Sequence, residues 1–194
     1  MKRRLPPKVV LLLGVAAVIG VSDQVSKYLA VRDLTSVFER SGTIVFSDRV
    51  AQFYGESELE HLSRPPAVLL TGGWRHRYTE NPGAAFSLFD DAPVGFRRVF
   101  FLLSMILAGA FVGVMTWRLP REAPWRVISL GAILGGATGN FVDRVAHLYV
   151  IDFIDLLYGM PVWLNPATFN LADAGISCGA AVLLVSIARE AFQR

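Results

Sequence analysis

Two aspartates in the C-terminal quarter of the chain have apolar neighbours: Asp152 in Val150–Ile–Asp–Phe153, and Asp173 in Phe169–Asn–Leu–Ala–Asp173. Asn170 stands three residues before Asp173 and shares its predicted helix face. A carboxylate beside hydrocarbon is costly unless it has a partner, a water-filled cavity or a function. Two carboxylates that lie close together share a proton, so one can activate water while the other polarises a carbonyl group. That chemistry hydrolyses peptides without a metal, although cation or proton transport is an alternative use that the spacing alone leaves open.

Other polar residues repeat this pattern at membrane depth. Asn140, Asp143 and Arg144 occupy positions i, i+3 and i+4 of one predicted helix and therefore one face. Asp23 and Lys27 are four residues apart and can form an ion pair. Each group has a structural explanation by itself, but their gathering at the ends of predicted helices favours a functional site.

The composition of the chain indicates a membrane environment for these residues. The 194 residues are 53% hydrophobic and only 18% charged, with a mean hydropathy of +0.45. Soluble domains usually carry about 25% charged residues. The charges are clustered and leave long uncharged runs, so we expect one integral membrane domain over residues 1–194.

Four of these runs predict transmembrane helices, over about residues 8–31, 97–117, 126–144 and 170–189. The expected fold is an all-α membrane protein with four transmembrane helices. The small residues of Gly135–Gly–Ala–Thr–Gly139 allow neighbouring helices to approach closely. The N-terminal run also resembles a cleaved signal peptide, but no small-residue cleavage site follows it, so we expect a retained helix.

Basic residues near the helix ends predict the orientation. They cluster in three segments, as Lys2, Arg3, Arg4, Lys8, Arg118, Arg121, Arg126, Arg189 and Arg194, against Glu122 and Glu190. With four spans these segments fall on one side, which places both termini in the cytoplasm and residues 32–95 and 145–169 in outer loops. Arg97 and Arg98, at the outer end of the second helix, run against the rule.

The first outer loop divides into two parts. Residues 68–89 contain β-forming residues and end near the turn-prone Glu80–Asn–Pro–Gly83, which predicts a small β-rich cradle on the periplasmic face between helices one and two. Residues 36–64 are charged without a clear period, and Glu56–Ser–Glu–Leu–Glu60 is expected to be solvated surface.

Other site chemistries have little support in the sequence. The single cysteine, Cys178, excludes an intramolecular disulfide and is expected to be a buried packing residue. His61, His76 and His147 are scattered, so no metal site is expected. A nucleic-acid partner would need a basic water-exposed domain, which the sequence lacks.

Five segments together resemble the lipoprotein signal peptidases, also called signal peptidase II. They are Asp23–Gln–Val–Ser–Lys27, Asn81–Pro–Gly–Ala–Ala–Phe86, Gly135–Gly–Ala–Thr–Gly–Asn–Phe–Val–Asp–Arg144, Val150–Ile–Asp–Phe153 and Phe169–Asn–Leu–Ala–Asp173. Each is modest alone, but in this order on four predicted helices they are highly specific. The resemblance covers nearly the whole chain except about residues 36–64.

The resemblance implies an intramembrane aspartic endopeptidase with Asp152 and Asp173 as its catalytic residues. It implies substrate-binding or site-supporting roles for Asn81, Gly83, Asn140, Arg144 and Asn170, and structural roles for Asp23, Lys27 and Asp143. The implied substrate is a diacylglyceryl-modified prolipoprotein in the membrane lipid of the bacterial inner membrane, cut before its lipidated cysteine at the outer face. The family uses no cofactor and is inhibited by globomycin; a single bundle with its own site is expected to be monomeric.

Two departures from the family pattern and two rival functions are noted. Family members usually carry a glycine near Leu148, so the local backbone path here is in question, and residues 36–64 form a longer loop than usual. A cation or proton carrier usually needs acids near the midplane or repeat symmetry, which this chain lacks. A silent paralogue would more plausibly have lost one of the two aspartates.

Overall fold

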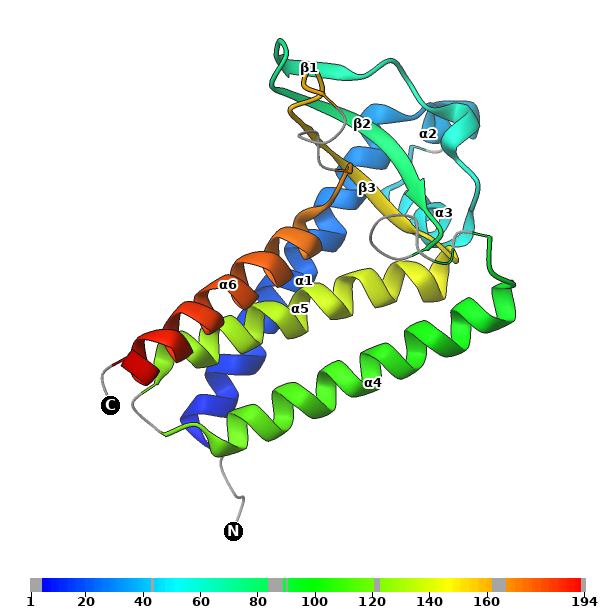
Figure 1. Cartoon of the computed structure of the whole chain (residues 1–194). Coiled ribbons are helices and arrows are strands. Elements are labelled where there is room, and N and C mark those ends of the chain that lie inside the picture. The colour runs from blue at the N-terminus through cyan, green and yellow to red at the C-terminus, as the bar shows by residue number, and fades with distance from the viewer. Residues whose placement is uncertain are drawn as a thin grey trace. The chain divides into compact units, whose positions relative to one another are not determined.

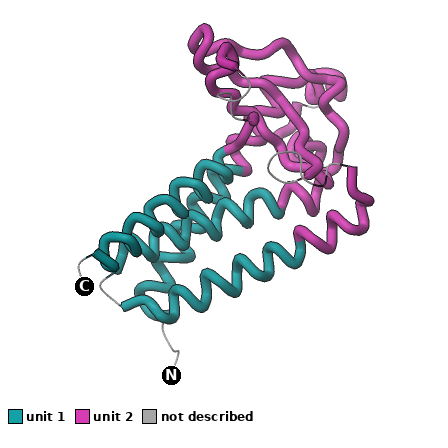
Figure 2. Tube along the Cα trace, viewed as in Figure 1, with its two compact units in different colours: residues 1–23, 102–141, 171–194 teal, residues 24–101, 142–170 magenta. Residues whose placement is uncertain are grey.

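The computed structural model describes residues 5–42, 44–83, 89, 91–120, 123–161 and 167–192. The chain divides into two compact units (Figure 2): unit 1 comprises Met1–Asp23, Leu102–Phe141 and Leu171–Arg194, and unit 2 comprises Gln24–Phe101 and Val142–Asn170. Some residues used in the sequence analysis lie outside the described ones: Lys2, Arg3, Arg4, Ala84, Ala85, Phe86, Arg121, Glu122 and Arg194.

Four long helices correspond to the four predicted ones (Figure 1): α1 Pro7–Leu34, α4 Val94–Arg118, α5 Pro124–Ala146 and α6 Leu171–Phe192. Within the described part of the chain, three of them, α1, α4 and α6, are long and apolar enough to cross a membrane. α5 is less apolar because Asn140, Asp143 and Arg144 occupy its last two turns. The protein is therefore mostly helical, with a small sheet described below.

In unit 1, glycines of α5 allow close packing against α1 and α6. A Cβ atom at Gly135 would lie 2.5 Å from the carbonyl oxygen of Ala16 on α1, and one at Gly136 would collide with the carbonyl oxygen of Ala172 on α6. No side chain fits at either position unless the helices separate. The predicted close approach through the small residues of α5 is confirmed.

Cys178 corrects one prediction, because its side chain is exposed and not buried. The buried residues of α6 are Ala172, Gly179 and Leu183, which lie along one stripe of the helix. Cys178 falls beside that stripe, and an apolar thiol is as compatible with a lipid-facing position as with a packed one.

Unit 2 contains a three-stranded antiparallel sheet in the order β1-β2-β3. Its strands are β1 Ala67–Leu70, β2 Trp74–Asn81 and β3 Val150–Leu156 (Figure 1). The predicted small sheet is present, but its third strand comes from the segment between α5 and α6 and not from the first loop. β3 is buried along most of its length, which agrees with a sequence that is apolar except at Asp152 and Asp155.

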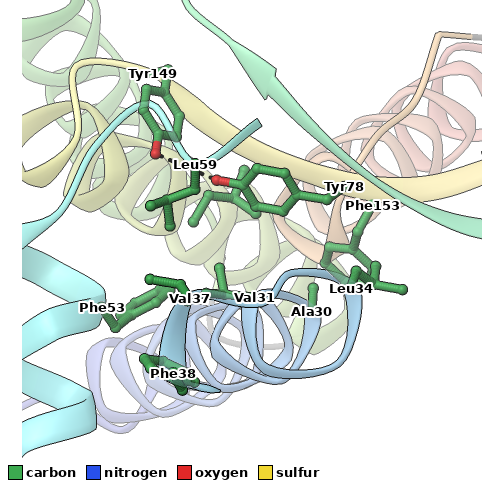
Figure 3. Close-up of a cluster of buried hydrophobic side chains, with 11 residues drawn as sticks. Ala30, Val31, Leu34, Val37, Phe38, Phe53, Leu59, Tyr78, Tyr149 and Phe153 are labelled. Atoms are coloured by element: carbon green, nitrogen blue, oxygen red, sulfur yellow. Dashed lines mark hydrogen bonds between the residues drawn. The ribbon is translucent and has the colours of Figure 1, made fainter. Parts of the chain in front are cut away.

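Residues 36–64 are more ordered than the sequence suggested. They form the short helices α2 Val37–Arg40 and α3 Phe46–Gly55 and the 3₁₀ turn η1 Glu60–Leu62. Figure 3 shows Phe38, Phe53 and Leu59 of this segment packed in one buried cluster with residues of α1 and the sheet. The glutamates around Leu59 are exposed as predicted, so the error concerned the apolar residues, whose spacing is irregular because three short elements supply them.

Two tyrosines of this cluster are hydrogen-bonded to each other and link β2 to the start of β3. The hydroxyl groups of Tyr78 on β2 and Tyr149, just before β3, lie 3.3 Å apart (Figure 3). Tyr78 also donates to Glu80 at 3.1 Å. Burial raises the pKa of both phenols above the usual value of a tyrosine. Both therefore remain neutral hydrogen-bonding groups under physiological conditions.

The backbone of the turn between α5 and β3 shows why glycine would suit position 148, where this chain has leucine instead. Leu148 has a φ of 71°, in the left-handed region that favours glycine. The preceding His147 holds the turn: its Nδ1 lies 3.1 Å from the carbonyl oxygen of Glu56, and its ring stacks on Tyr149 at 5.5 Å. Burial lowers the pKa of His147, which keeps the ring neutral in this packing.

This conformation predicts the effect of two substitutions. Leu148→Gly should be more stable than Leu148→Ala by about 1 kcal/mol, because both lose the leucine side chain but only alanine keeps a Cβ in the left-handed region. Thermal unfolding of the purified variants in one detergent measures the difference. Ala146→Gly, at the end of α5, is the matched control and should be destabilising. An alanine variant more stable than the glycine variant at position 148 would contradict the prediction.

Candidate active site

The register of β2 and β3 places Asn81 beside Asp152. Thr79 is opposite Asp152, and Asn81 is opposite Val150. Because side chains alternate between faces, Asn81 and Asp152 are diagonal neighbours on one face of the sheet. The Nδ2 atom of Asn81 accordingly donates to Oδ2 of Asp152 at 3.1 Å.

A second amide holds the other carboxylate oxygen. Asn170 precedes α6, and its Nδ2 donates to Oδ1 of Asp152 at 2.7 Å and to the carbonyl oxygen of Ile151 at 3.3 Å. Asp152 is 2% exposed and Asn170 is completely buried. A buried carboxylate is stable only when its oxygens are hydrogen-bonded, and here each oxygen has an amide donor.

Unit 2 also contains a fully buried ion pair between Lys27 and Asp143. The Nζ of Lys27 on α1 lies 2.8 Å from Oδ2 of Asp143 on α5, and neither side chain is exposed. Asp143 also accepts from the Nε2 of Gln24 at 2.8 Å and from the backbone N–H of Ile151 at 3.1 Å. One carboxylate therefore joins α1, α5 and the strand residue next to Asp152.

Arg144, also on α5, contacts the turn that follows β2. Its Nη2 donates to the carbonyl oxygen of Gly83 at 2.7 Å, and its guanidinium carbon lies 3.9 Å above the ring of Phe101. Gly83 and Arg144, two of the predicted site residues, are thus in direct contact. A guanidinium group on an aromatic face combines a cation–π contact with its hydrogen bond.

In unit 1, Asp173 has its own amide partner. It lies in the first turn of α6, and the Nδ2 of Asn140 on α5 donates to its Oδ1 at 2.7 Å. Asp173 is partly buried, whereas Asn140 is 9% exposed. The N-terminus of a helix favours a negative charge, so this position also suits an ionised carboxylate.

Asp23 supports the same end of α6. Its Oδ1 accepts the backbone N–H of Ala172 at 2.9 Å, one of the N–H groups that a helix cannot satisfy by itself. Its carboxylate packs directly against Gly139, where a Cβ atom would collide with it. Asp23 is fully buried, and its structural role stays a prediction.

The two predicted catalytic aspartates therefore each have their own hydrogen-bonded amide side chains, and each aspartate lies in a different unit. Asp152 with Asn81 and Asn170 belongs to unit 2, and Asp173 with Asn140 belongs to unit 1. The approach of the two aspartates to each other and the pairing of Asp23 with Lys27 stay predictions. Among the described residues, no group of three or more histidine, cysteine or acidic side chains could hold a metal ion.

The sequence alone assigned no partner to a further buried carboxylate, Asp155. Asp155 on β3 has a 3% exposed side chain and lies 2.7 Å from the Nε of Arg75 and 3.6 Å from the Nε of Arg77, both on β2. The alternation of Arg75 and Arg77 along a predicted strand was the available signal, because it places two cations on one face of the sheet, where one acidic side chain can lie close to both.

Comparison with known proteins identifies the relatives of this chain. Residues 15–189 match a family model described as signal peptidase (SPase) II. A lipoprotein signal peptidase from Anaeromyxobacter sp. (strain Fw109-5) is 40% identical over 84% of this chain and 77% of its own length. Another, from Pseudomonas fluorescens (strain Pf0-1), is 38% identical over 74% of this chain and 82% of its own.

A solved structure has a similar fold. It is described as a bacterial membrane enzyme, has a TM-score of 0.67 at 18% identity, and matches 94% of this chain and 90% of its own. At that level of identity the similarity concerns the fold alone. The likeness agrees with a mostly helical fold that includes a small sheet.

Proposed function

Because this chain belongs to the signal peptidase II family of lipoprotein signal peptidases, we propose that it is an intramembrane aspartic endopeptidase. The family consists of membrane peptidases of lipoprotein processing. The proposed substrate is a diacylglyceryl-modified prolipoprotein, cut on the N-terminal side of its lipidated cysteine. The observation that carries the proposal is Asp152, a buried carboxylate held by the amides of Asn81 and Asn170.

Asp152 and Asp173 are the proposed catalytic pair. Asn170 supports this pairing, because it donates to Asp152 and stands only three residues before Asp173 along the chain. Asn140 holds Asp173 from α5, as Asn81 and Asn170 hold Asp152. Two carboxylates in one apolar site cannot both ionise easily, so they share one proton.

This shared proton suffices for hydrolysis of an amide. The ionised carboxylate takes a proton from water as the water oxygen attacks the scissile carbonyl carbon, and the protonated carboxyl group donates its proton to the carbonyl oxygen. The tetrahedral intermediate then collapses: the second carboxylate takes back a proton from one of its two hydroxyl groups as the C=O bond re-forms, the C–N bond breaks, and the departing amine takes the proton that was removed from water. The amides of Asn81, Asn140 and Asn170 keep the carboxylates oriented through both steps.

We propose α5 as the fourth span. Its 23 residues extend roughly 34 Å at 1.5 Å per residue, enough for a hydrocarbon core of about 30 Å. Its glycines pack against α1 and α6, so its polar residues need not face lipid. With four spans, the basic segments predict that both termini lie in the cytoplasm of a bacterial cell and that the site lies at the outer face of the inner membrane. A monomer is sufficient for this arrangement.

Cleavage assays with matched substrates test this function. The purified protein should cleave a diacylated prolipoprotein at least about a hundredfold faster than the same chain without the lipid, because two acyl chains supply many buried methylene groups. Globomycin should abolish the cleavage. Mass spectrometry of the products locates the cut. Equal cleavage of the unmodified chain, or a cut elsewhere, would contradict the proposal.

A further inference from the structure

Arg97 lies at a position where a positive charge is electrostatically unfavourable. It is the fourth residue of α4, where the helix dipole is positive, and the first turn of α4 contains no acidic residue. In the proposed topology it also lies at the outer end of a span, against the positive-inside rule. A cation that two effects oppose requires a specific partner.

That partner is the turn after β2. The Nη1 of Arg97 donates to the carbonyl oxygen of Pro82 at 2.8 Å. The next carbonyl group, that of Gly83, accepts from Arg144 on α5 at 2.7 Å. Two successive peptide groups are thus each held by one guanidinium, from two different helices.

On α4, Arg97 shares a helix face with Phe101, the residue that contacts Arg144 of α5. Phe101 lies one turn after Arg97, and its ring stacks under the guanidinium of Arg144 at 3.9 Å. Arg97 is partly buried, whereas its neighbour Arg98 is exposed. We call the hydrogen bonds of Arg97 to Pro82 and of Arg144 to Gly83 the clamp. Arg98 carries the same charge as Arg97 but is exposed and does not belong to the clamp.

The clamped turn begins at Asn81, which binds Asp152. β2 ends at Asn81, and beyond it the strand ladder no longer fixes the backbone. Pro82 has no N–H group, so its carbonyl oxygen is its only backbone group for hydrogen bonding. A charged donor on this oxygen forms a stronger bond than a neutral one and limits rotation of the segment that carries the Asn81 amide.

We propose that Arg97 is a positioning residue that fixes the turn Asn81–Pro82–Gly83 and thereby aims the Asn81 amide at Asp152. The inference rests on the proposed function only in its catalytic consequence, because the turn itself can be observed without substrate. Arg97 acts on the reaction through Asn81, so its loss should change the rate of the chemical step more than the binding of substrate.

Kinetics with matched variants test the catalytic consequence. Arg97→Gln should lower kcat about ten- to a hundredfold with little change in KM, as small misplacements of catalytic groups do. The acid limb of its pH–rate profile should move to higher pH, because the Asn81 amide favours the ionised carboxylate. Arg98→Gln should behave as the wild type, and Arg97→Lys should recover part of the loss, since one ammonium donor can replace Nη1.

Two further measurements distinguish a failure of the proposed role of Arg97 from a failure of the proposed function. Asn81→Ala combined with Arg97→Gln should be no slower than Asn81→Ala alone, and additive losses would overturn the proposal. Amide hydrogen exchange of peptides covering residues 79–83 should rise in Arg97→Gln and not in Arg98→Gln. Unchanged exchange would overturn the clamp even if the wild type proved inactive on prolipoproteins, whereas an inactive wild type with the expected exchange would refute only the proposed function.

Discussion

Replacement of Asp152 or Asp173 by asparagine is expected to lower kcat for prolipoprotein cleavage by about 10³-fold or more. Asparagine keeps the size of the side chain and an acceptor oxygen for the neighbouring amides, but it cannot accept a proton from water. Thermal unfolding should show that both variants remain folded. Because the two groups act as a unit, the double variant should be about as slow as either single variant.

Asp155→Asn is the matched control for this experiment. It removes a buried carboxylate from the same strand, three residues after Asp152, but its partners are Arg75 and Arg77. We expect it to be less stable than the wild type and to keep its kcat within a few-fold, because an ion pair in the sheet is lost and no reacting group is changed. Turnover by Asp152→Asn or Asp173→Asn at the rate of Asp155→Asn would refute the catalytic assignment.

The second large effect is expected on stability, from Lys27→Met. Methionine fills a similar volume but leaves the fully buried Asp143 carboxylate without the ammonium group 2.8 Å away. Removal of one partner from a buried pair typically destabilises a protein by about 3–5 kcal/mol. Thermal unfolding in detergent should show this as a large fall in the midpoint temperature and as loss of folded protein.

A surface pair on the same helix provides the comparison. Arg32 and Asp33, at the end of α1, have side chains that are 46% and 55% exposed. Arg32→Met should cost less than about 1 kcal/mol, because exposed pairs contribute little. Addition of Asp143→Asn to Lys27→Met should restore part of the stability, since it removes the uncompensated charge and keeps an acceptor for Ile151 N–H. Equal losses in Lys27→Met and Arg32→Met would contradict this account.

The helices and the site residues were predictable to different degrees. Hydropathy located α1, α4, α5 and α6, because each is longer than a chance apolar run. The polar stretches within α5 and α6 likewise marked Asn140 and Asp173, which are hydrogen-bonded to each other in the structure. Such signals are local, and a single sequence contains them.

Contacts that depend on strand register could not be derived from local sequence patterns. Asn81 and Asp152 are neighbours because β2 pairs with a strand from a distant loop, and nothing near either residue specifies that partner. Lys27 had an acceptable local partner in Asp23, so the spacing did not point to Asp143. The core residues of the segment 36–64, such as Phe53, were missed because three short elements supply them in no regular period.

The pairing of β2 with β3 also constrains the order in which the protein can assemble. β2 emerges from the ribosome before α4 and α5, whereas β3 follows both helices, so the sheet closes only over a very long loop. Asn81 can therefore meet Asp152 only after both α4 and α5 have been synthesised. Nascent chains that stop short of residue 150 contain β1 and β2 without the strand that completes them. Such a partly made chain therefore lacks the contact between the Asn81 amide and the Asp152 carboxylate, which forms only after β3 has been synthesised.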